Sequence, residues 1–311
     1  MRVIVYMKLL PINLDVPVNG YLHHAHVNSI ILGQKPEAYH WINNMYLQLY
    51  YNDLNIDTTL DFFTFKYNFD CLETGYIRPF LLGNIDDIKS IIEKSIDNNF
   101  YITCLIDEFY VDGMPVYNKM HFDHWCLIFG YDNSNYYCVG YLKNGKYQKY
   151  CLPKNVFFRD CFKVKYGIGL NSVKDNYIFD NNDYAVQLIR DYIQGVNTSD
   201  KYGLISKKIE GSYGISIYND LVKETEKILD VRYAHILLEH KFCVCRFLND
   251  NNTLCSDLAE NYTKIISYCK TIKLLSIKQY AENSLATKKR IQNLLKKAQD
   301  EEYNILIKLL Q

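Results

Sequence analysis

Three histidines lie close together in the segment GYLHHAHVNSIILG, residues 20–33. The apolar residues that follow them predict a helix beginning at about this point. A helix N-terminus carries partial positive charge, which lowers the pKa of a thiol placed there and favours a nucleophilic cysteine. The residue between His24 and His26 is nevertheless Ala25. The surroundings of position 25 therefore suit a nucleophile, but the side chain of Ala25 is only a methyl group.

A fourth histidine, His124, opens the segment HWCLIFGYD, residues 124–132. The β-branched and aromatic residues of this segment predict a buried strand. If the helix start packs against this strand, an imidazole fixed at the strand edge would face position 25. A histidine and a helix N-terminus are together the setting that activates a cysteine nucleophile.

The order of these motifs resembles the papain-like cysteine peptidase superfamily. The resemblance rests on the His24–Ala25 pair at a helix start, on H-W-C-L-I-F-G-Y-D, and on the following Y-Y-C-V-G-Y strand. Within the superfamily it points to the branch of the butirosin-biosynthesis acyltransferase and the bacteriocin-leader peptidases, over about residues 10–165. It implies a cysteine at position 25 and His124 as general base and acid. Asn19, six residues before Ala25, takes the place of the family's oxyanion-hole glutamine.

The chain departs from this family pattern at the nucleophile and at the residue that orients the histidine. Ala25 indicates a silenced form of a cysteine enzyme, which we favour, or a natural pseudoenzyme. The family often has an aspartate where this chain has Gly140, so another residue must orient the imidazole unless the site works as a dyad. The candidates for this role are Asn144, Asp123 and Asp107. Candidate substrate-binding residues are His24 and Asp123.

The resemblance implies an acyltransferase that forms amide bonds. A cysteine would take the acyl chain from a phosphopantetheine thioester on an acyl or peptidyl carrier protein, and a small amine or diamine would release it. Such a reaction belongs to nonribosomal-peptide or thioamide natural-product assembly, and no resident cofactor is expected. The basic segment 287–299 is either a solvated helix face or a docking surface for the acidic carrier. The alternatives are a papain-like peptidase and a non-enzymatic scaffold that binds a peptide or carrier protein.

The remaining patterns predict an α+β fold. Residues 86–100 predict an amphipathic helix. Short strands separated by Asn, Asp and Gly turns predict an antiparallel meander between residues 101 and 152. Long amphipathic helices follow from about residue 180. We expect a papain-like domain over residues 1–170, with N-terminal helices packed on an antiparallel sheet, and an α-helical domain over residues 171–311. The boundary falls within the segment 167–182.

Composition argues against several classes of protein. The chain has 35 Lys and Arg against 35 Asp and Glu, so no net charge attracts it to nucleic acid or to an anionic membrane. No segment approaches the length of a membrane span. The ten cysteines are scattered, mostly in apolar segments, which predicts reduced, buried thiols in a cytoplasmic protein. The histidines and cysteines lack the spacing of a complete metal site, so no metal is expected.

Overall fold

The computed structural model describes residues 6–52, 59–62, 69–198 and 211–310, without the side chains of 252–256. The chain forms two compact units. Unit 1 comprises Met1–Ala38 and Asn68–Ile178, and unit 2 comprises Tyr39–Tyr67 and Phe179–Gln311. The α+β arrangement is confirmed, with N-terminal helices, an antiparallel sheet and a C-terminal helical region.

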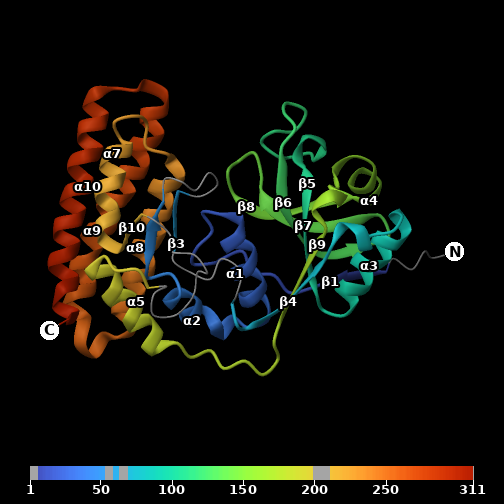
Figure 1. Ribbon diagram of the computed structural model, residues 1–311, viewed down its shortest axis with the longest axis horizontal. Helices are drawn as coiled ribbons and strands as arrows, with labels where there is room; N and C mark the ends of the chain where they lie inside the picture. Colours follow the sequence, from blue (N-terminus) through green and yellow to red (C-terminus); the bar gives the residue numbers. More distant parts are fainter. Residues whose placement is uncertain (1–5, 53–58, 63–68, 199–210, 311) are drawn as a thin grey trace. The chain divides into compact units, whose positions relative to one another are not determined.

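Unit 1 is built on a seven-stranded sheet in the order β4-β9-β5-β6-β7-β8, with β1 paired to β6 (Figure 1). All its pairings are antiparallel. The strands are β1 (Met7–Leu9), β4 (Leu72–Ile77), β5 (Tyr101–Asp107), β6 (Asp123–Asp132), β7 (Asn135–Tyr141), β8 (Tyr147–Pro153) and β9 (Ile168–Val173). The predicted meander is confirmed by β6, β7 and β8. The sequence did not predict β4 and β9, which extend the sheet beyond β5.

In the described part of unit 1, the main helices are α1 and α3, together with short helical turns. Helix α3 (Ile85–Asp97) confirms the expected amphipathic helix: Asn84 and Asp87 form a capping box at its start, and its buried isoleucines face the sheet. Helix α1 (Leu22–Gln34) begins where the apolar residues after the histidines predict a helix start. The short elements are η1 (Pro36–Ala38), η2 (Pro79–Leu81), η3 (Glu108–Tyr110), α4 (Lys154–Val156), η4 (Phe157–Cys161) and η5 (Val164–Tyr166).

Helix α1 is fixed against the chain segment that precedes it. The Asn28 side chain donates a hydrogen bond of 3.0 Å to the carbonyl of Val18. Near the other end of the helix, Gly33 lies so close to Pro11 that a Cβ there would overlap the Pro11 carbonyl. These contacts set the position of the helix start, where the histidine cluster lies.

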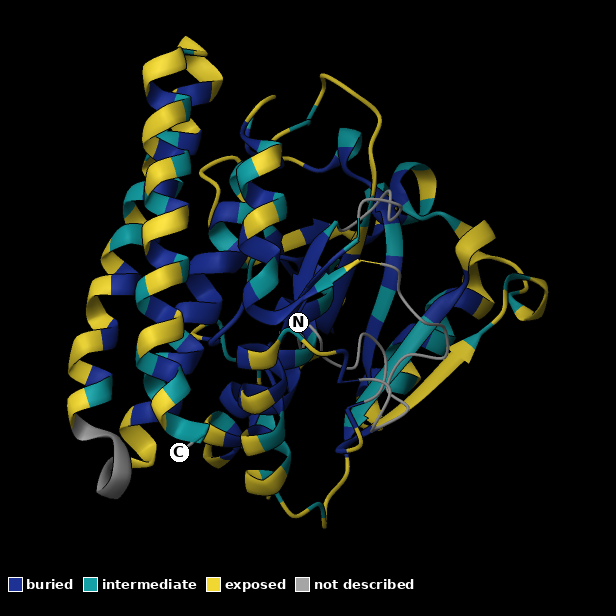
Figure 2. Cartoon of the chain, turned by 60° about the vertical axis from the view of Figure 1, so that its left-hand side comes forward, coloured by how far each residue is buried: buried dark blue, intermediate teal, exposed yellow. Residues whose placement is uncertain are grey.

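Unit 2 is mainly helical. Its helices are α2 (Tyr39–Asn44), α5 (Asn182–Gln194), α7 (Ile217–Glu224), α8 (Val231–Asp250), α9 (Asn252–Glu282) and α10 (Leu285–Leu306), with η6 (Gly214–Ser216) and η7 (Ile307–Leu310). Helix α9 packs against both α8 and α10. Figure 2 shows the amphipathic pattern of the long helices, with exposed and buried stripes along each. A small sheet in the order β10-β2-β3 completes the unit, from β2 (Leu49–Tyr51), β3 (Leu60–Phe62) and β10 (Ser212–Tyr213).

The division into units differs from the expected domains at one segment. Residues 39–67, expected in the first domain, belong to unit 2. The reason is long-range pairing: β2 pairs with β10, and the Asn43 side chain donates to the carbonyl of Cys243. The later boundary, after Ile178, lies within the expected segment 167–182.

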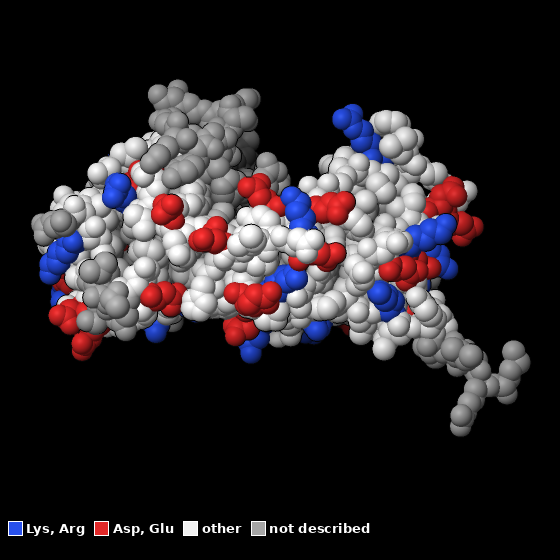
Figure 3. Space-filling view, turned by 90° about the horizontal axis from the view of Figure 1, so that it is seen from below, with Lys and Arg blue, Asp and Glu red and all other residues white. Residues whose placement is uncertain are grey.

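The surface carries both signs of charge. Lysine and arginine side chains are interspersed with aspartate and glutamate on the face seen in Figure 3, in keeping with the balanced composition. Among the described residues, no helix combines the length and the apolar character needed to cross a membrane.

Candidate active site

The first turn of α1 contains Ala25, as the sequence predicts. Tyr21 precedes the helix in an extended conformation, and its carbonyl accepts hydrogen bonds from the N–H groups of His24 (3.1 Å) and Ala25 (2.9 Å). Ala25 is 0% exposed, and His24 and His26 are also buried. The residue at the nucleophile position is therefore part of a packed interior at a helix N-terminus.

The rings beside Ala25 contact one another. The Nε2 atoms of His23 and His24 are 3.1 Å apart, so one ring donates to the other. The ring of Tyr21 stacks on His23, with centroids 5.4 Å apart and planes inclined by 13°. These contacts hold the imidazole of His24, a candidate substrate-binding residue, at the helix start.

His124 forms a pair with a buried carboxylate. His124 lies opposite Ile106 in the β5–β6 register. Glu108 follows Ile106 by two residues, at the start of η3 just after the end of β5. The His124 Nδ1 atom is 2.8 Å from Oε1 of Glu108, whose side chain is 8% exposed. A carboxylate at Nδ1 fixes the ring orientation, stabilises an imidazolium, and leaves Nε2 for proton transfer.

Glu108 is the functional candidate that the sequence analysis missed. It precedes His124 by 16 residues, and only the pairing of β5 with β6 brings the two together. At Gly140, where the family often has an aspartate, an added Cβ would contact Tyr150 and Met114. The one signal in the sequence was an acidic residue at the end of a predicted strand, which is too common to be diagnostic.

The two aspartates proposed as orienting residues have other partners. Asp107 accepts hydrogen bonds from His121 (2.7 Å) and Lys163 (3.0 Å). Burial alone would raise the pKa of Asp107, but these and backbone hydrogen bonds lower it to about 2. Asp123 lies opposite Asp107 in the strand register and shares the same lysine at 3.5 Å. This charged cluster is separate from the pair that His124 makes.

The two asparagines named from the sequence lie in different surroundings. Asn144 is exposed in the β7–β8 turn, where its Oδ1 accepts from the N–H of Lys146 and from Nε2 of Gln148, both at 3.0 Å. Its contacts thus stabilise the turn. Asn19 is half-buried just before α1, in the segment that the Asn28 side chain ties to the helix. The structure therefore brings Asn19, but not Asn144, to the helix start.

His26 links the helix start to the strand histidine. Its ring centroid is 6.0 Å from that of Tyr147 on β8. Burial, and to a lesser extent the neighbouring charge of His124, lower the pKa of His26 to about 3, against a hydrogen bond to the backbone of Val139 on β7 that raises it. The first turn of α1 thus packs on β7 and β8, and the residue after Ala25 lies within electrostatic reach of His124.

The buried thiols of unit 1 differ from a nucleophile. Cys126 follows His124 by two residues on β6, and its Sγ lies 3.2 Å from the hydroxyl of Tyr150. Burial raises the pKa of Cys104 and Cys138, and it raises that of Cys161 to about 12. Cys104, Cys138 and Cys161 therefore stay protonated at neutral pH, whereas a nucleophile requires a lowered pKa. Cys255 lies outside the described side chains.

Histidines outside the first turn of α1 also have partners within the protein. His121 and His124 each contact a different carboxylate. In unit 2, His240 donates from Nε2 to the carbonyl of Leu47 and accepts at Nδ1 from Lys241, both at 3.1 Å. These contacts fix the orientations of the three rings.

Comparison with known proteins adds no assignment. No protein-family model matches this chain, and no curated protein matches it. The resemblance to the papain-like branch stays a prediction, and the geometry around Ala25 and His124 carries the functional argument.

Proposed function

We propose that this chain has the site of a papain-like, cysteine-dependent acyltransferase in which position 25 is the nucleophile position. The observation that supports it is the His124–Glu108 pair at 2.8 Å, on the sheet against which the first turn of α1 packs. A histidine held by a buried carboxylate beside a helix N-terminus is the arrangement that activates a thiol. With Ala25 in place, the chain as it stands is inactive in this reaction.

The proposed reaction needs a cysteine at position 25. His124 Nε2 would take the thiol proton while Glu108 stabilises the imidazolium. The thiolate attacks the thioester carbonyl, a new C–S bond forms, and the carrier thiol leaves with the proton from His124. An amine then attacks the acyl-enzyme, a C–N bond forms, and the enzyme thiol is released. Asn19 is the proposed oxyanion donor.

The donor and acceptor are proposed from the family resemblance. The donor is a phosphopantetheine thioester on an acidic carrier protein, and the acceptor is a small amine or diamine. Helix α10 offers a basic surface for such a carrier, because Lys289, Arg290, Lys296 and Lys297 are exposed on it. Lys297 lies 4.0 Å from Glu301, so part of this charge is balanced within the helix.

The test is to install the nucleophile and look for the acyl-enzyme. Ala25→Cys, the unchanged chain and Ala25→Cys/His124→Ala are incubated with a hexanoyl thioester of a holo carrier protein, and intact mass is recorded. We expect a hexanoyl adduct on Ala25→Cys alone, released as an amide by 1,3-diaminopropane. A folded Ala25→Cys protein that gains no adduct contradicts the proposal. Release as the free acid, with no amide, would favour the peptidase alternative.

The complete burial of Ala25 favours a second candidate, a pseudoenzyme that serves as a binding scaffold. A side chain with no exposed surface cannot meet a substrate unless the surrounding residues move. In this case the carrier would bind the unchanged chain and Ala25→Cys equally well, and neither protein would be acylated. Calorimetric titration with the holo carrier, run beside the mass measurement, separates this outcome from a chain that does not bind the carrier.

A further inference from the structure

The turn between α9 and α10 is a well-defined end of the helical bundle of unit 2, drawn at the top of Figure 1. Asn283 ends α9 in a left-handed backbone conformation, and its N–H donates to the carbonyl of Gln279 (2.8 Å). The Ser284 side chain accepts from the N–H of Thr287 in the first turn of α10 (3.3 Å). We call residues 270–290 the α9–α10 tip. Because both helix ends are capped, the hairpin presents the side chains of the tip in a fixed arrangement.

The last turns of α9 place polar residues inward and apolar residues outward. Ser276 and Gln279 are 0% exposed, and the Gln279 side chain contacts backbone groups of Lys227 and Leu229 in the α7–α8 loop, both at 3.3 Å. The large apolar side chains of the tip are instead 49–68% exposed; they belong to Leu274, Ile277, Tyr280 and Leu285. A helix that packs only against its own bundle shows the opposite pattern. Packing within the bundle therefore does not explain the outward apolar residues.

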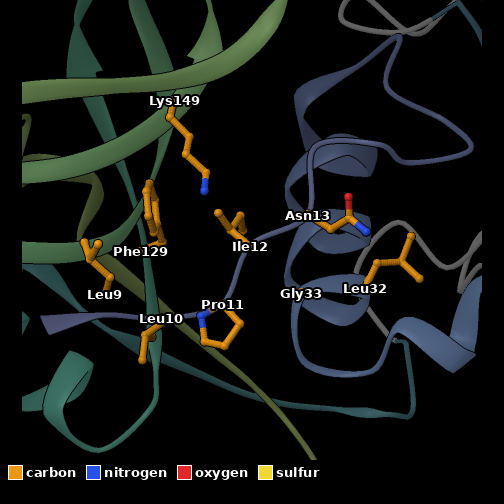
Figure 4. Close-up of a pocket in the computed structure, with 9 residues that line it drawn as sticks. All are labelled: Leu9, Leu10, Pro11, Ile12, Asn13, Leu32, Gly33, Phe129 and Lys149. Atoms are coloured by element: carbon orange, nitrogen blue, oxygen red, sulfur yellow. The ribbon is translucent and has the colours of Figure 1, made fainter.

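The exposed apolar surface of the tip contrasts with the groove beside α1 that Figure 4 shows. In that groove Leu10, Leu32 and Phe129 are at most 4% exposed, so their apolar surface is already buried within the protein. At the α9–α10 tip, four large apolar side chains remain in water. Apolar clusters left in water mark surfaces that bind a partner or a membrane.

The tip also has a local excess of positive charge, although the charges of the whole chain balance. It contains one acidic residue, Glu282, and six basic residues: Lys270, Lys273, Lys278, Lys288, Lys289 and Arg290. In the described part of the chain, Lys278 alone among these six forms an ion pair with a carboxylate, that of Glu282 at 3.4 Å. Residues 223–232, which include the neighbouring α7–α8 loop, contain three basic and three acidic residues, so they do not neutralise the excess. The tip therefore favours a negatively charged surface.

We propose that the α9–α10 tip binds the surface of an anionic membrane. The lysines and Arg290 would lie at the lipid phosphates, with Leu274, Ile277, Tyr280 and Leu285 in the headgroup–acyl boundary, where aliphatic side chains and tyrosine are favourably placed. A lipid interface accepts the end of a hairpin without a preformed shape, whereas a protein partner would need a matching groove. A second copy of this chain is disfavoured, because two tips of the same charge repel each other. The inference is independent of the proposed acyl transfer.

The first test measures binding to vesicles that differ in headgroup charge. The full chain is sedimented at physiological ionic strength with vesicles of phosphatidylglycerol and phosphatidylcholine in equal parts, and with vesicles of phosphatidylcholine alone. We expect binding to the anionic vesicles to be at least about tenfold stronger, because several basic residues of the tip reach the headgroups together. Equal binding to the two kinds of vesicle, or no binding to the anionic ones, overturns the proposal.

The second test locates the charge that binds. Lys289→Glu/Arg290→Glu reverses two exposed charges of the tip, and Lys143→Glu/Lys146→Glu makes the same change at exposed lysines of the β7–β8 turn in unit 1. We expect at least about a tenfold loss of binding to anionic vesicles for the first variant and less than about a twofold loss for the second. Equal losses overturn the proposal. A chain that ignores the vesicles but binds the acidic holo carrier, and loses that binding in Lys289→Glu/Arg290→Glu, has a protein-docking tip, which also overturns it.

The third test asks whether the apolar residues enter the membrane. Leu274→Gln/Leu285→Gln removes apolar surface from the tip, and glutamine has a helix propensity close to that of leucine, so α9 and α10 are retained. The matched control is Phe80→Gln/Leu81→Gln, at residues of unit 1 that are 77% and 62% exposed. We expect binding to anionic vesicles to fall about fivefold or more for the tip variant and to stay unchanged for the control. Unchanged binding of the tip variant would show attraction by charge alone and would contradict the proposed insertion.

Discussion

At the scale of single residues, Glu108 determines how His124 can act. Its carboxylate is buried and 2.8 Å from Nδ1 of the imidazole. A carboxylate there stabilises the imidazolium, which in turn stabilises a thiolate at the nucleophile position. In an Ala25→Cys background, we expect Glu108→Gln to raise the pKa of the new thiol by about one unit, equivalent to ~1.4 kcal/mol. The rate of alkylation by iodoacetamide against pH measures this shift.

The control for Glu108 is a residue that the sequence suggested for the same role. Asn144→Ala, in the same Ala25→Cys background, removes only contacts within the β7–β8 turn. We expect its alkylation profile to match that of Ala25→Cys. If Asn144→Ala shifts the profile and Glu108→Gln does not, the orienting role belongs to Asn144 after all.

His26 makes stability depend on pH. Burial lowers its pKa to about 3 in the folded protein, against about 6.5 in the unfolded chain. Between these values the unfolded chain binds a proton that the folded protein does not, so stability falls as pH drops from 6.5 towards 3. The slope for one such group is about 1.4 kcal/mol per pH unit. We expect His26→Gln to flatten the pH dependence of urea unfolding by about this amount between pH 6 and pH 4.

In His26→Gln, other titratable groups account for the pH dependence of stability that remains. Burial also lowers the pKa of His240 well below its usual value, so part of the dependence survives in His26→Gln. Asp107, with its pKa lowered to about 2, affects stability only below about pH 4. His40→Gln changes a histidine whose side chain is 73% exposed and serves as the matched control. An unchanged slope in His26→Gln would mean that His26 is charged in the folded protein.

At the scale of secondary structure, local patterns were predictable and long-range pairing was not. The β6–β7–β8 meander follows from alternating residues and turn chemistry, and α3 follows from its capping residues and isoleucine spacing. Strands β4 and β9 carry weaker local signals, and they pair with each other across 90 or more residues of chain. Glu108 could not be predicted for the same reason, because it contacts His124 only through the pairing of β5 with β6.

The helices of unit 2 are joined through a buried ion pair. Lys241 of α8 lies 2.8 Å from Glu302 of α10, and both side chains are 0% exposed. Three tyrosine hydroxyls also donate to the Glu302 carboxylate, from α5, α7 and α9. They belong to Tyr192, Tyr218 and Tyr262. The charges of Lys241 and Glu302 therefore have their partners only while the helices α5, α7, α8, α9 and α10 stay packed together.

Removing one charge should cost more than removing both. Lys241→Met leaves a buried carboxylate without its cation, and we expect a loss of about 3–5 kcal/mol in the free energy of unfolding. Lys241→Met/Glu302→Gln leaves no net charge and keeps an acceptor for the tyrosines, so it should be more stable than Lys241→Met. Urea unfolding followed by far-UV circular dichroism measures both. Lys297→Met, at an exposed lysine of α10, is the control.

At the scale of the whole molecule, the helical unit is discontinuous in sequence. After η1, the described residues 39–52 and 59–62 pack in unit 2, before the chain returns to complete the sheet of unit 1. Leu47, Leu49 and Phe62 from this segment are at most 2% exposed. The Leu47 carbonyl also accepts the hydrogen bond from His240. An expected domain of residues 171–311 therefore lacks part of the core of unit 2.

This discontinuity predicts how fragments behave. We expect residues 171–311 alone to be helical but to unfold without a cooperative transition, because β10 loses its pairing partner and His240 loses its acceptor. Residues 39–67 joined ahead of residue 179 by a flexible glycine–serine linker should restore a cooperative transition, since the linker replaces only the excursion through unit 1. Thermal and urea unfolding by circular dichroism compare the two fragments. Cooperative unfolding of 171–311 alone, at the stability of the joined fragment, would show that residues 39–67 contribute little to the core of unit 2.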